Sequence, residues 1–167
     1  AKAGDEHEIT GLKVGADAYV TKPFNKAKLL VQIENLLNIR SQLQKRYSKD
    51  FKLKDLAVSN TEQQFLEKLN SILNEFISDN SFSAEILSKK LLMSRMQLHR
   101  KLKALTGLTT SEFITKERLK LALHLLKSSD ANISEIAYEI GFNSPSYFST
   151  CFKKQYNSTP DEYRSSQ

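Results

Sequence analysis

The sequence predicts a mainly helical protein in which one long helix joins two helix-turn-helix subdomains. Two stretches, Phe82–Gly107 and Ile133–Arg164, each contain a short amphipathic segment, a tight turn and a second segment that is basic and free of acids. Between them, Ser111 to Lys127 carries apolar residues at helical spacing and is long enough to connect the two. These observations place the fold in the all-α class, and the elements follow in chain order.

The N-terminal third contains one amphipathic helix and a linker. From Lys26 onward, apolar residues recur at helical spacing, interrupted at Arg40: Leu29, Leu30, Ile33, Leu36, Leu37, Leu43 and Tyr47. Such a face is exposed unless something covers it, so self-association through it is plausible, and a helix without a partner is an equal alternative. Residues 48–60 are polar and charged, which indicates a linker.

The first helix-turn-helix is preceded by a helix that a capping box at Thr61 and Gln64 opens. Ser83 is predicted to cap the next helix, and Ser94 with Gln97 forms a second capping box. The helix that follows ends at Gly107 and carries four cations without an acid between them: Arg95, Arg100, Lys101 and Lys103. Leu92 occupies the turn, where a left-handed conformation costs leucine more than glycine.

The second helix-turn-helix follows the long helix, which Thr109 and Glu112 are predicted to cap. Ser134 is expected to cap its first helix, Gly141 supplies the positive φ of the turn, and Ser144 caps the second helix. Phe148, Phe152 and Tyr156 recur every four residues and are predicted to face inward. This spacing leaves polar residues on the outer faces: Ser146, Tyr147, Ser149, Thr150, Lys153 and Lys154.

Composition excludes several other classes of function. The net charge is +6, and residues 83–167 carry most of the excess, which fits nucleic-acid binding without proving it. A single cysteine, Cys151, excludes an internal disulfide and a cysteine-based metal site, and the three histidines lack ligand spacing. We expect no cofactor and no enzymatic activity. No segment is long enough to cross a membrane, so we expect a cytoplasmic protein without membrane contact, although a membrane anchor in a longer parent protein stays open.

The motif G-F-N-S-P-S-Y-F-S-x-x-F-K-K-x-Y-x-x-T-P-x-x-Y-R, within residues 141–164, resembles the signature of AraC-type transcription regulators. The resemblance covers residues 65–163 and implies a DNA-binding domain at 61–167 that contacts duplex DNA in adjacent major grooves. It implies base-reading roles for Met96, His99, Arg100, Ser146, Tyr147 and Thr150. It implies phosphate contacts for Arg95, Lys103, Ser149, Lys153 and Lys154, and a structural role for Arg118 between the two halves.

A second motif, G-A-D-A-Y-V-T-K-P-F in residues 15–24, resembles the end of a response-regulator receiver domain. The resemblance implies a receiver remnant at 1–47, with a strand at Ala18–Thr21 and a helix capped by Asn25. It also implies that Lys22 contacts a phosphoryl group, that the Lys22–Pro23 bond is cis, and that the phosphoacceptor lies outside this sequence.

Together the two resemblances imply a transcription regulator at the output end of a two-component phosphorelay. The combination is similar to the hybrid sensor-regulators of gut bacteria that control polysaccharide use. A stand-alone response regulator with the same output domain is the alternative. A protein-protein interaction module is the alternative from another class, and salt-dependent DNA binding separates it from the first two.

Overall fold

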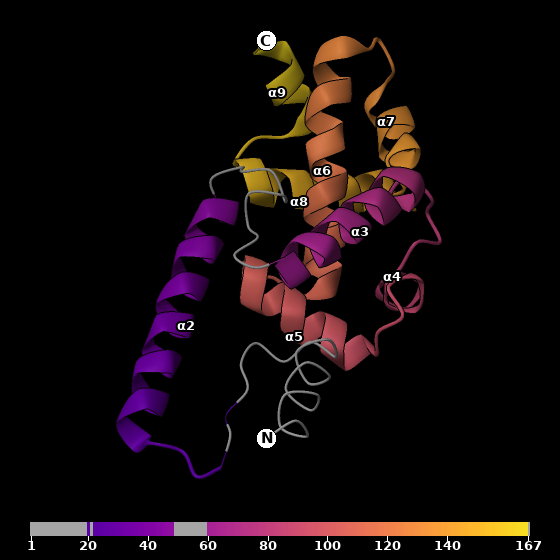
Figure 1. Ribbon diagram of the computed structural model, residues 1–167. Coiled ribbons are helices and arrows are strands. Elements are labelled where there is room, and N and C mark those ends of the chain that lie inside the picture. The colour runs from indigo at the N-terminus through magenta and orange to yellow at the C-terminus, as the bar shows by residue number, and fades with distance from the viewer. Residues whose placement is uncertain (1–19, 21, 49–59, 167) are drawn as a thin grey trace. The chain divides into compact units, whose positions relative to one another are not determined.

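The computed structural model describes residues 20, 22–48 and 60–166. The chain divides into two units, residues 1–66 with 104–106 and residues 67–103 with 107–167. Every regular element in the described ranges is an α-helix (Figure 1), which confirms the mainly helical class. The predicted strand at Ala18–Thr21 lies, apart from Val20, outside the described residues. The predicted domain boundaries at residues 47, 60 and 61 stay a prediction.

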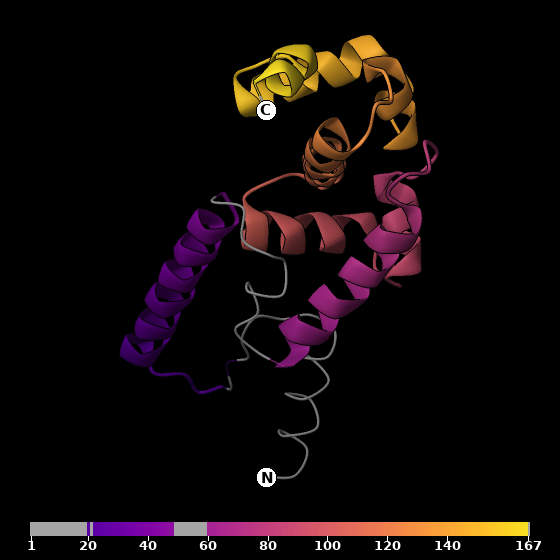
Figure 2. The same ribbon diagram turned by 90° about the horizontal axis from the view of Figure 1, so that it is seen from above.

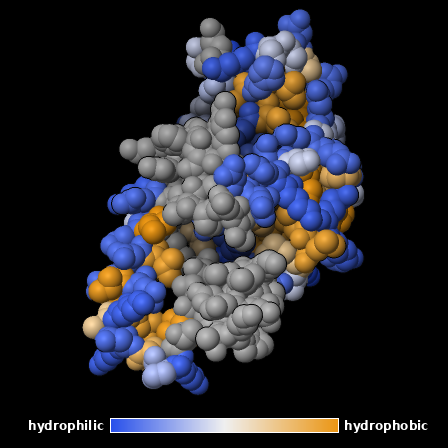
Figure 3. Space-filling view, in the orientation of Figure 1, coloured by the Kyte–Doolittle hydropathy of each residue, from blue (hydrophilic) through white to orange (hydrophobic). Residues whose placement is uncertain are grey.

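Helix α2 (Lys26–Ser48) begins where the sequence predicts. The side-chain oxygen of Asn25 accepts hydrogen bonds from the backbone N–H of Ala27 and Lys28, at 2.9 and 3.2 Å, so Asn25 caps the helix. The Lys22–Pro23 peptide bond is cis, as the resemblance implied. Large apolar side chains are exposed on and beside this helix, among hydrophilic neighbours (Figure 3): Phe24, Leu30, Val31, Ile33 and Leu37.

Helices α3 (Asn60–Phe76), α4 (Ala84–Lys90) and α5 (Arg95–Thr106) form the first helix-turn-helix with its leading helix. Helix α3 begins at Asn60, one residue before the predicted capping box, within the usual uncertainty of helix ends. Ser83 caps α4, and Ser94 and Gln97 form the predicted capping box of α5. The inner faces of these helices are buried at Leu69, Ile72, Leu73, Leu87, Leu98 and Leu102.

Helix α6 (Thr110–Ser128) is the predicted long connecting helix, and Thr109 and Glu112 form its capping box. It contacts α4 and also α7, α8 and α9. Within the second unit, seen nearly along α6, residues 67–103 lie on one side of this helix and the helices that follow it lie on the other (Figure 2). Both helix-turn-helix motifs therefore pack against the connecting helix.

Helices α7 (Ile133–Glu139), α8 (Pro145–Tyr156) and α9 (Pro160–Ser165) complete the fold. The prediction that Ser134 caps α7 is wrong, because Asn132 holds that position. The side chain of Asn132 accepts from the Glu135 backbone N–H at 2.9 Å, and the Glu135 carboxylate accepts from the Asn132 N–H at 2.8 Å. This reciprocal pair satisfies two N–H groups that a helix start leaves open.

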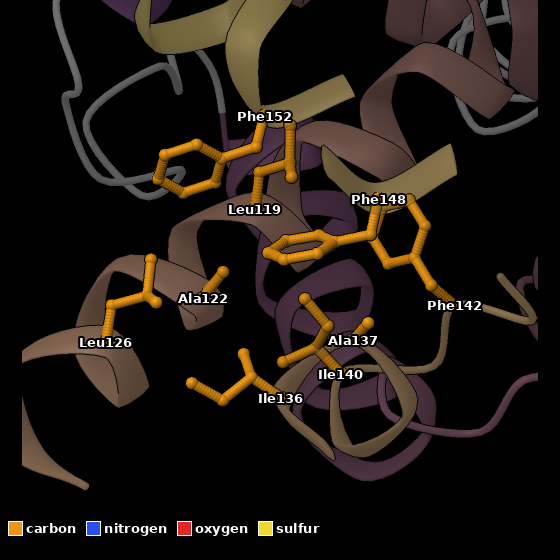
Figure 4. Packing of buried hydrophobic residues seen from close by; sticks show 9 residues of the cluster. All are labelled: Leu119, Ala122, Leu126, Ile136, Ala137, Ile140, Phe142, Phe148 and Phe152. Atoms are coloured by element: carbon orange, nitrogen blue, oxygen red, sulfur yellow. The ribbon is translucent and has the colours of Figure 1, made fainter. Parts of the chain in front are cut away.

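The core beside α6 combines aliphatic side chains of α6 and α7 with a row of aromatic rings from the turn and α8 (Figure 4). Phe148 and Phe152 of α8 are fully buried, and their ring centroids lie 5.7 Å apart in an edge-to-face arrangement. Phe142 meets Phe148 at 5.4 Å on one side, and Tyr163 of α9 meets Phe152 at 5.7 Å on the other. This aromatic ladder confirms the inward stripe predicted for α8 and fixes the rotation of the helix about its axis.

Arg118 of α6 links both halves of the second unit. Its guanidinium donates to the carbonyl oxygens of Ile77, Asp79 and Phe82, at 2.9, 2.8 and 3.2 Å, in the segment between α3 and α4. Gly141, in the turn between α7 and α8, has φ of 87°, and a Cβ there would lie 2.9 Å from the Ile77 oxygen and 3.0 Å from Arg118 Nε. The structural role expected for Arg118 is therefore explained by these contacts.

Candidate nucleic-acid interface

Helix α5 presents a basic outer face because its leucines turn inward. Leu98 and Leu102 have no exposed surface, and Met96 is 68% exposed. The helix has no acid in its first turn and starts from the Ser94–Gln97 capping box, which fixes its N-terminal end. The structure leaves all the candidate residues predicted on this helix exposed to solvent: Arg95, Met96, His99, Arg100 and Lys103.

Helix α8 presents the second candidate face. Ser146, Tyr147, Thr150, Lys153 and Lys154 are exposed as predicted, whereas Ser149 is only half-buried and so less accessible than the spacing suggested. The Thr150 hydroxyl donates to the Ser146 carbonyl oxygen at 2.9 Å, within the helix. Which of these residues read bases and which contact phosphates stays a prediction.

Tyr147 is exposed on the outer face of α8 and also contacts a ring of the core. Its ring centroid lies 6.0 Å from that of Phe142, yet 60% of the residue is exposed. A side-chain hydrogen bond with Cys151 raises the pKa of the Tyr147 hydroxyl, with the electrostatic interaction with Cys151 and burial adding to the effect. Tyr147 is therefore neutral across the physiological pH range and can serve as a hydrogen-bond donor.

Two carboxylates lie near the basic faces, and both are occupied as helix caps. Hydrogen bonds from the backbone and side chain of Thr109 lower the pKa of Glu112, and the charges of Lys103 and Lys154 lower it further. Glu162 has the same arrangement with Thr159 at the start of α9, and Lys153 also lowers its pKa. Both carboxylates are ionised at neutral pH, and each one offsets part of the neighbouring lysine charge.

A hollow of about 330 Å³ lies between α6 and α8. Tyr147, Cys151 and Lys154 line it from α8, and Lys116 lines it from α6, although only 8% of that lysine is exposed. Sequence spacing did not identify this hollow, because it depends on how two distant helices pack. Within the described ranges, no cluster of three or more histidine, cysteine, aspartate or glutamate residues is arranged to hold a metal ion.

The receiver-type residues cannot be assembled into a site from the described part of the chain. Lys22 and Pro23 are exposed, and residues 1–19 and 21 lie outside the described residues. Among the helices described, none combines the length and apolar character needed to cross a bilayer.

Comparison with known proteins gives consistent matches to the part of the chain that carries these helices. A family model described as a helix-turn-helix domain matches residues 87–166. The C-terminal domain of the two-component response regulator yesN from Fusobacterium nucleatum is 34% identical, with a TM-score of 0.55 over 59% of this chain and 95% of that one. The DNA-binding domain of the global transcriptional factor AdpA, solved with a target DNA, is 29% identical, with a TM-score of 0.56 over 60% of this chain and 89% of that one.

Two curated relatives extend the comparison. Histidine kinase P4 from Formosa agariphila is 38% identical over 160 residues, which are 95% of this chain and 12% of that protein. The HTH-type transcriptional activator RhaS from Mannheimia succiniciproducens is 39% identical over 110 residues, which are 66% of this chain and 40% of that protein. The chain therefore spans well under half the length of either relative.

Proposed function

Because the chain belongs to the AraC-type helix-turn-helix family of DNA-binding transcription regulators, we propose that α5 and α8 bind two adjacent major grooves of duplex DNA. The observation that carries the proposal is the pair of capped helices, each with no acid in its first turn and with most of its cations on an exposed face. A long helix connects these two helices, and such a connection is needed if both are to bind the same face of the DNA. The AdpA domain, a structural relative, was solved on its target DNA.

Within this interface, Arg100 is the strongest candidate for reading a base, because a guanidinium can hydrogen-bond both acceptors of guanine in the major groove. Met96, His99, Ser146, Tyr147 and Thr150 complete the proposed reading set. Arg95, Lys103, Ser149, Lys153 and Lys154 hold the phosphates, which positions the domain without selecting sequence.

The length of the connecting helix supports binding by one chain. Helix α6 has 19 residues and is therefore about 28 Å long. Successive major grooves on one DNA face recur about every 34 Å. A modest bend of the DNA, which costs on the order of a few kcal/mol, closes the difference. Two chains on repeated sites would bind more tightly than one, through a raised effective concentration of the second domain.

We further propose that the domain is the output of a two-component phosphorelay, in a hybrid sensor-regulator or in a separate response regulator, with polysaccharide use as a candidate target. A relative that aligns with 95% of this chain is a histidine kinase, and the yesN domain belongs to a response regulator. The motif around Lys22 and Pro23 agrees with this origin. On this proposal residues 1–47 are the end of a receiver, 48–60 a linker, and 61–167 the DNA-binding domain.

The test begins by selecting preferred duplexes from a random pool and measuring their affinity by fluorescence anisotropy across a salt series. Four proposed phosphate contacts carry charge, so the slope of log K against log salt should be about −3 to −4. Lys153→Ala should reduce the slope by about one. Lys68→Ala, an exposed lysine on α3, is the matched control and should leave it unchanged. A slope near zero would favour a protein-protein interaction module instead.

A footprint on the DNA upstream of the neighbouring genes then connects binding to regulation. Protection of two adjacent helical turns on one face is expected. Protection of a single turn would contradict the two-groove arrangement and leave DNA binding itself intact.

A further inference from the structure

Two apolar side chains stand out at the start of the first recognition helix. Leu92, in the turn between α4 and α5, is 87% exposed, and Met96, the second residue of α5, is 68% exposed. Among the large hydrophobic residues that the structure describes as exposed, these two have the greatest exposure. Isolated exposed apolar residues are common, but two within five residues at the N-terminal end of the helix proposed to meet DNA call for a physical reason.

The backbone of Leu92 makes this position unusual. Its φ is 57°, in the left-handed region that glycine enters more easily than leucine. The backbone N–H donates to the Lys89 carbonyl oxygen at 3.0 Å, a bond that glycine would make equally well. In the matching turn of the second helix-turn-helix, Gly141 is required by the contact with Arg118 and Ile77. The leucine side chain therefore adds little to the stability of the folded chain. A strained residue with an exposed side chain suggests a role in contacts outside the chain.

Position and charge identify the external partner. Leu92 lies two residues before Ser94, the N-cap of α5, and the first residues of a recognition helix contact base edges. Arg95 and Arg100 on the same helix favour a polyanion over an apolar protein surface. In a major groove the apolar group on a base edge is the C5-methyl of thymine. Neither a leucine nor a methionine side chain donates a hydrogen bond, so apolar contact is the means of selection open to them.

We propose that Leu92 and Met96 together read thymine methyl groups in the half-site bound by α5. This inference rests on the proposed DNA binding and adds the chemistry of the bases selected. It assigns Leu92 a specificity role that the motif does not contain, and it gives a reason for a leucine at a turn position whose left-handed backbone glycine adopts at lower cost.

The experiment replaces thymines with deoxyuridine, one at a time, in a selected duplex, and uses the wild-type chain first. Removing one methyl from an apolar contact should weaken binding about fourfold at one or two positions in the α5 half-site. Pairing with adenine and backbone charge are unchanged by the swap, so phosphate contacts do not contribute to the difference. Uniform affinity for the thymine and uracil duplexes would overturn the inference, while salt-dependent binding to both would leave the proposed function standing.

Protein variants then locate the effect. Leu92→Gly should abolish the uracil penalty at one position and raise the melting temperature of the free chain, because it removes backbone strain. Met96→Ala should abolish a penalty at the same or the adjacent position. Leu121→Ala, an apolar residue on α6 that is 37% exposed, is the control and should retain the penalty. If Leu92→Gly lowered both stability and affinity without changing the uracil penalty, the leucine would be structural and the inference would fail.

Discussion

Replacing Gly141 with alanine should destabilise the second unit by about 2–4 kcal/mol. Placing a Cβ on a residue with φ of 87° costs roughly 1–2 kcal/mol, and the smaller unfolded-state entropy of alanine returns less than about 1 kcal/mol. The new carbon would lie 2.9 Å from the Ile77 oxygen and 3.0 Å from Arg118 Nε, so the guanidinium must shift. Losing one of its three hydrogen bonds to carbonyl oxygens costs about 1.5–3 kcal/mol.

Thermal and urea unfolding measure this effect, and a fall in Tm of about 10 °C or more is expected for a unit of this size. Gly107→Ala is the control for the backbone contribution, because Gly107 has a similar φ of 78°. In an Arg118→Ala background, Gly141→Ala should cost less than in the wild type, since the displaced group is gone. A Gly141→Ala cost equal to that of Gly107→Ala, or strict additivity with Arg118→Ala, would show that the contact with Arg118 is not the source.

Three further outcomes are expected. Arg100→Ala should reduce the free energy of binding to the preferred site by about 1–3 kcal/mol and relax selectivity at one base pair. Lys153→Ala should instead weaken binding to all sequences alike. Competition assays on matched and mismatched duplexes distinguish the two outcomes. The chain should be monomeric when dilute and should associate through the exposed face of α2 at high concentration. Sedimentation across a concentration series measures this association. A dimer that forms at nanomolar protein and persists in the Leu36→Glu variant would contradict the prediction. The Thr109 cap and nearby lysines lower the pKa of Glu112 below its ordinary value of 4.5. The Glu112 carboxylate should therefore stabilise the fold fully above pH 4.5, and this stabilisation should be lost as the pH falls through the lowered pKa. Urea midpoints for wild type and Glu112→Gln between about pH 3 and 6 should converge at the acid end.

Local sequence rules predicted the helix starts because each capping bond joins residues two or three positions apart. Ser94 with Gln97 and Thr109 with Glu112 needed no knowledge of the rest of the fold. The wrong cap at Ser134 could have been avoided by the same rule. The residue three positions after Asn132 is Glu135, which can return the bond, whereas the residue three after Ser134 is Ala137, which cannot.

The features that sequence could not provide depend on residues far apart in the chain. The carbonyl partners of Arg118 lie 36 to 41 residues away, so the resemblance gave it a structural role without identifying its contacts. The hollow between α6 and α8 and the half-buried position of Ser149 likewise follow from helix packing rather than from periodicity. The residues proposed to face DNA were predictable as exposed, because they occupy the faces left over by the inward stripes.

The aromatic ladder of α8 has a consequence for how such a protein can evolve. Phe148 and Phe152 hold the helix from one side only, and they share no position with the residues turned toward solvent. Substitutions at Ser146 or Thr150 can therefore accumulate without disturbing the rings that hold the helix. Inherited variation can retarget the regulator to new promoters while its scaffold stays the same, and chimaeras that exchange only the solvent-facing positions of α8 should fold as well as their parents.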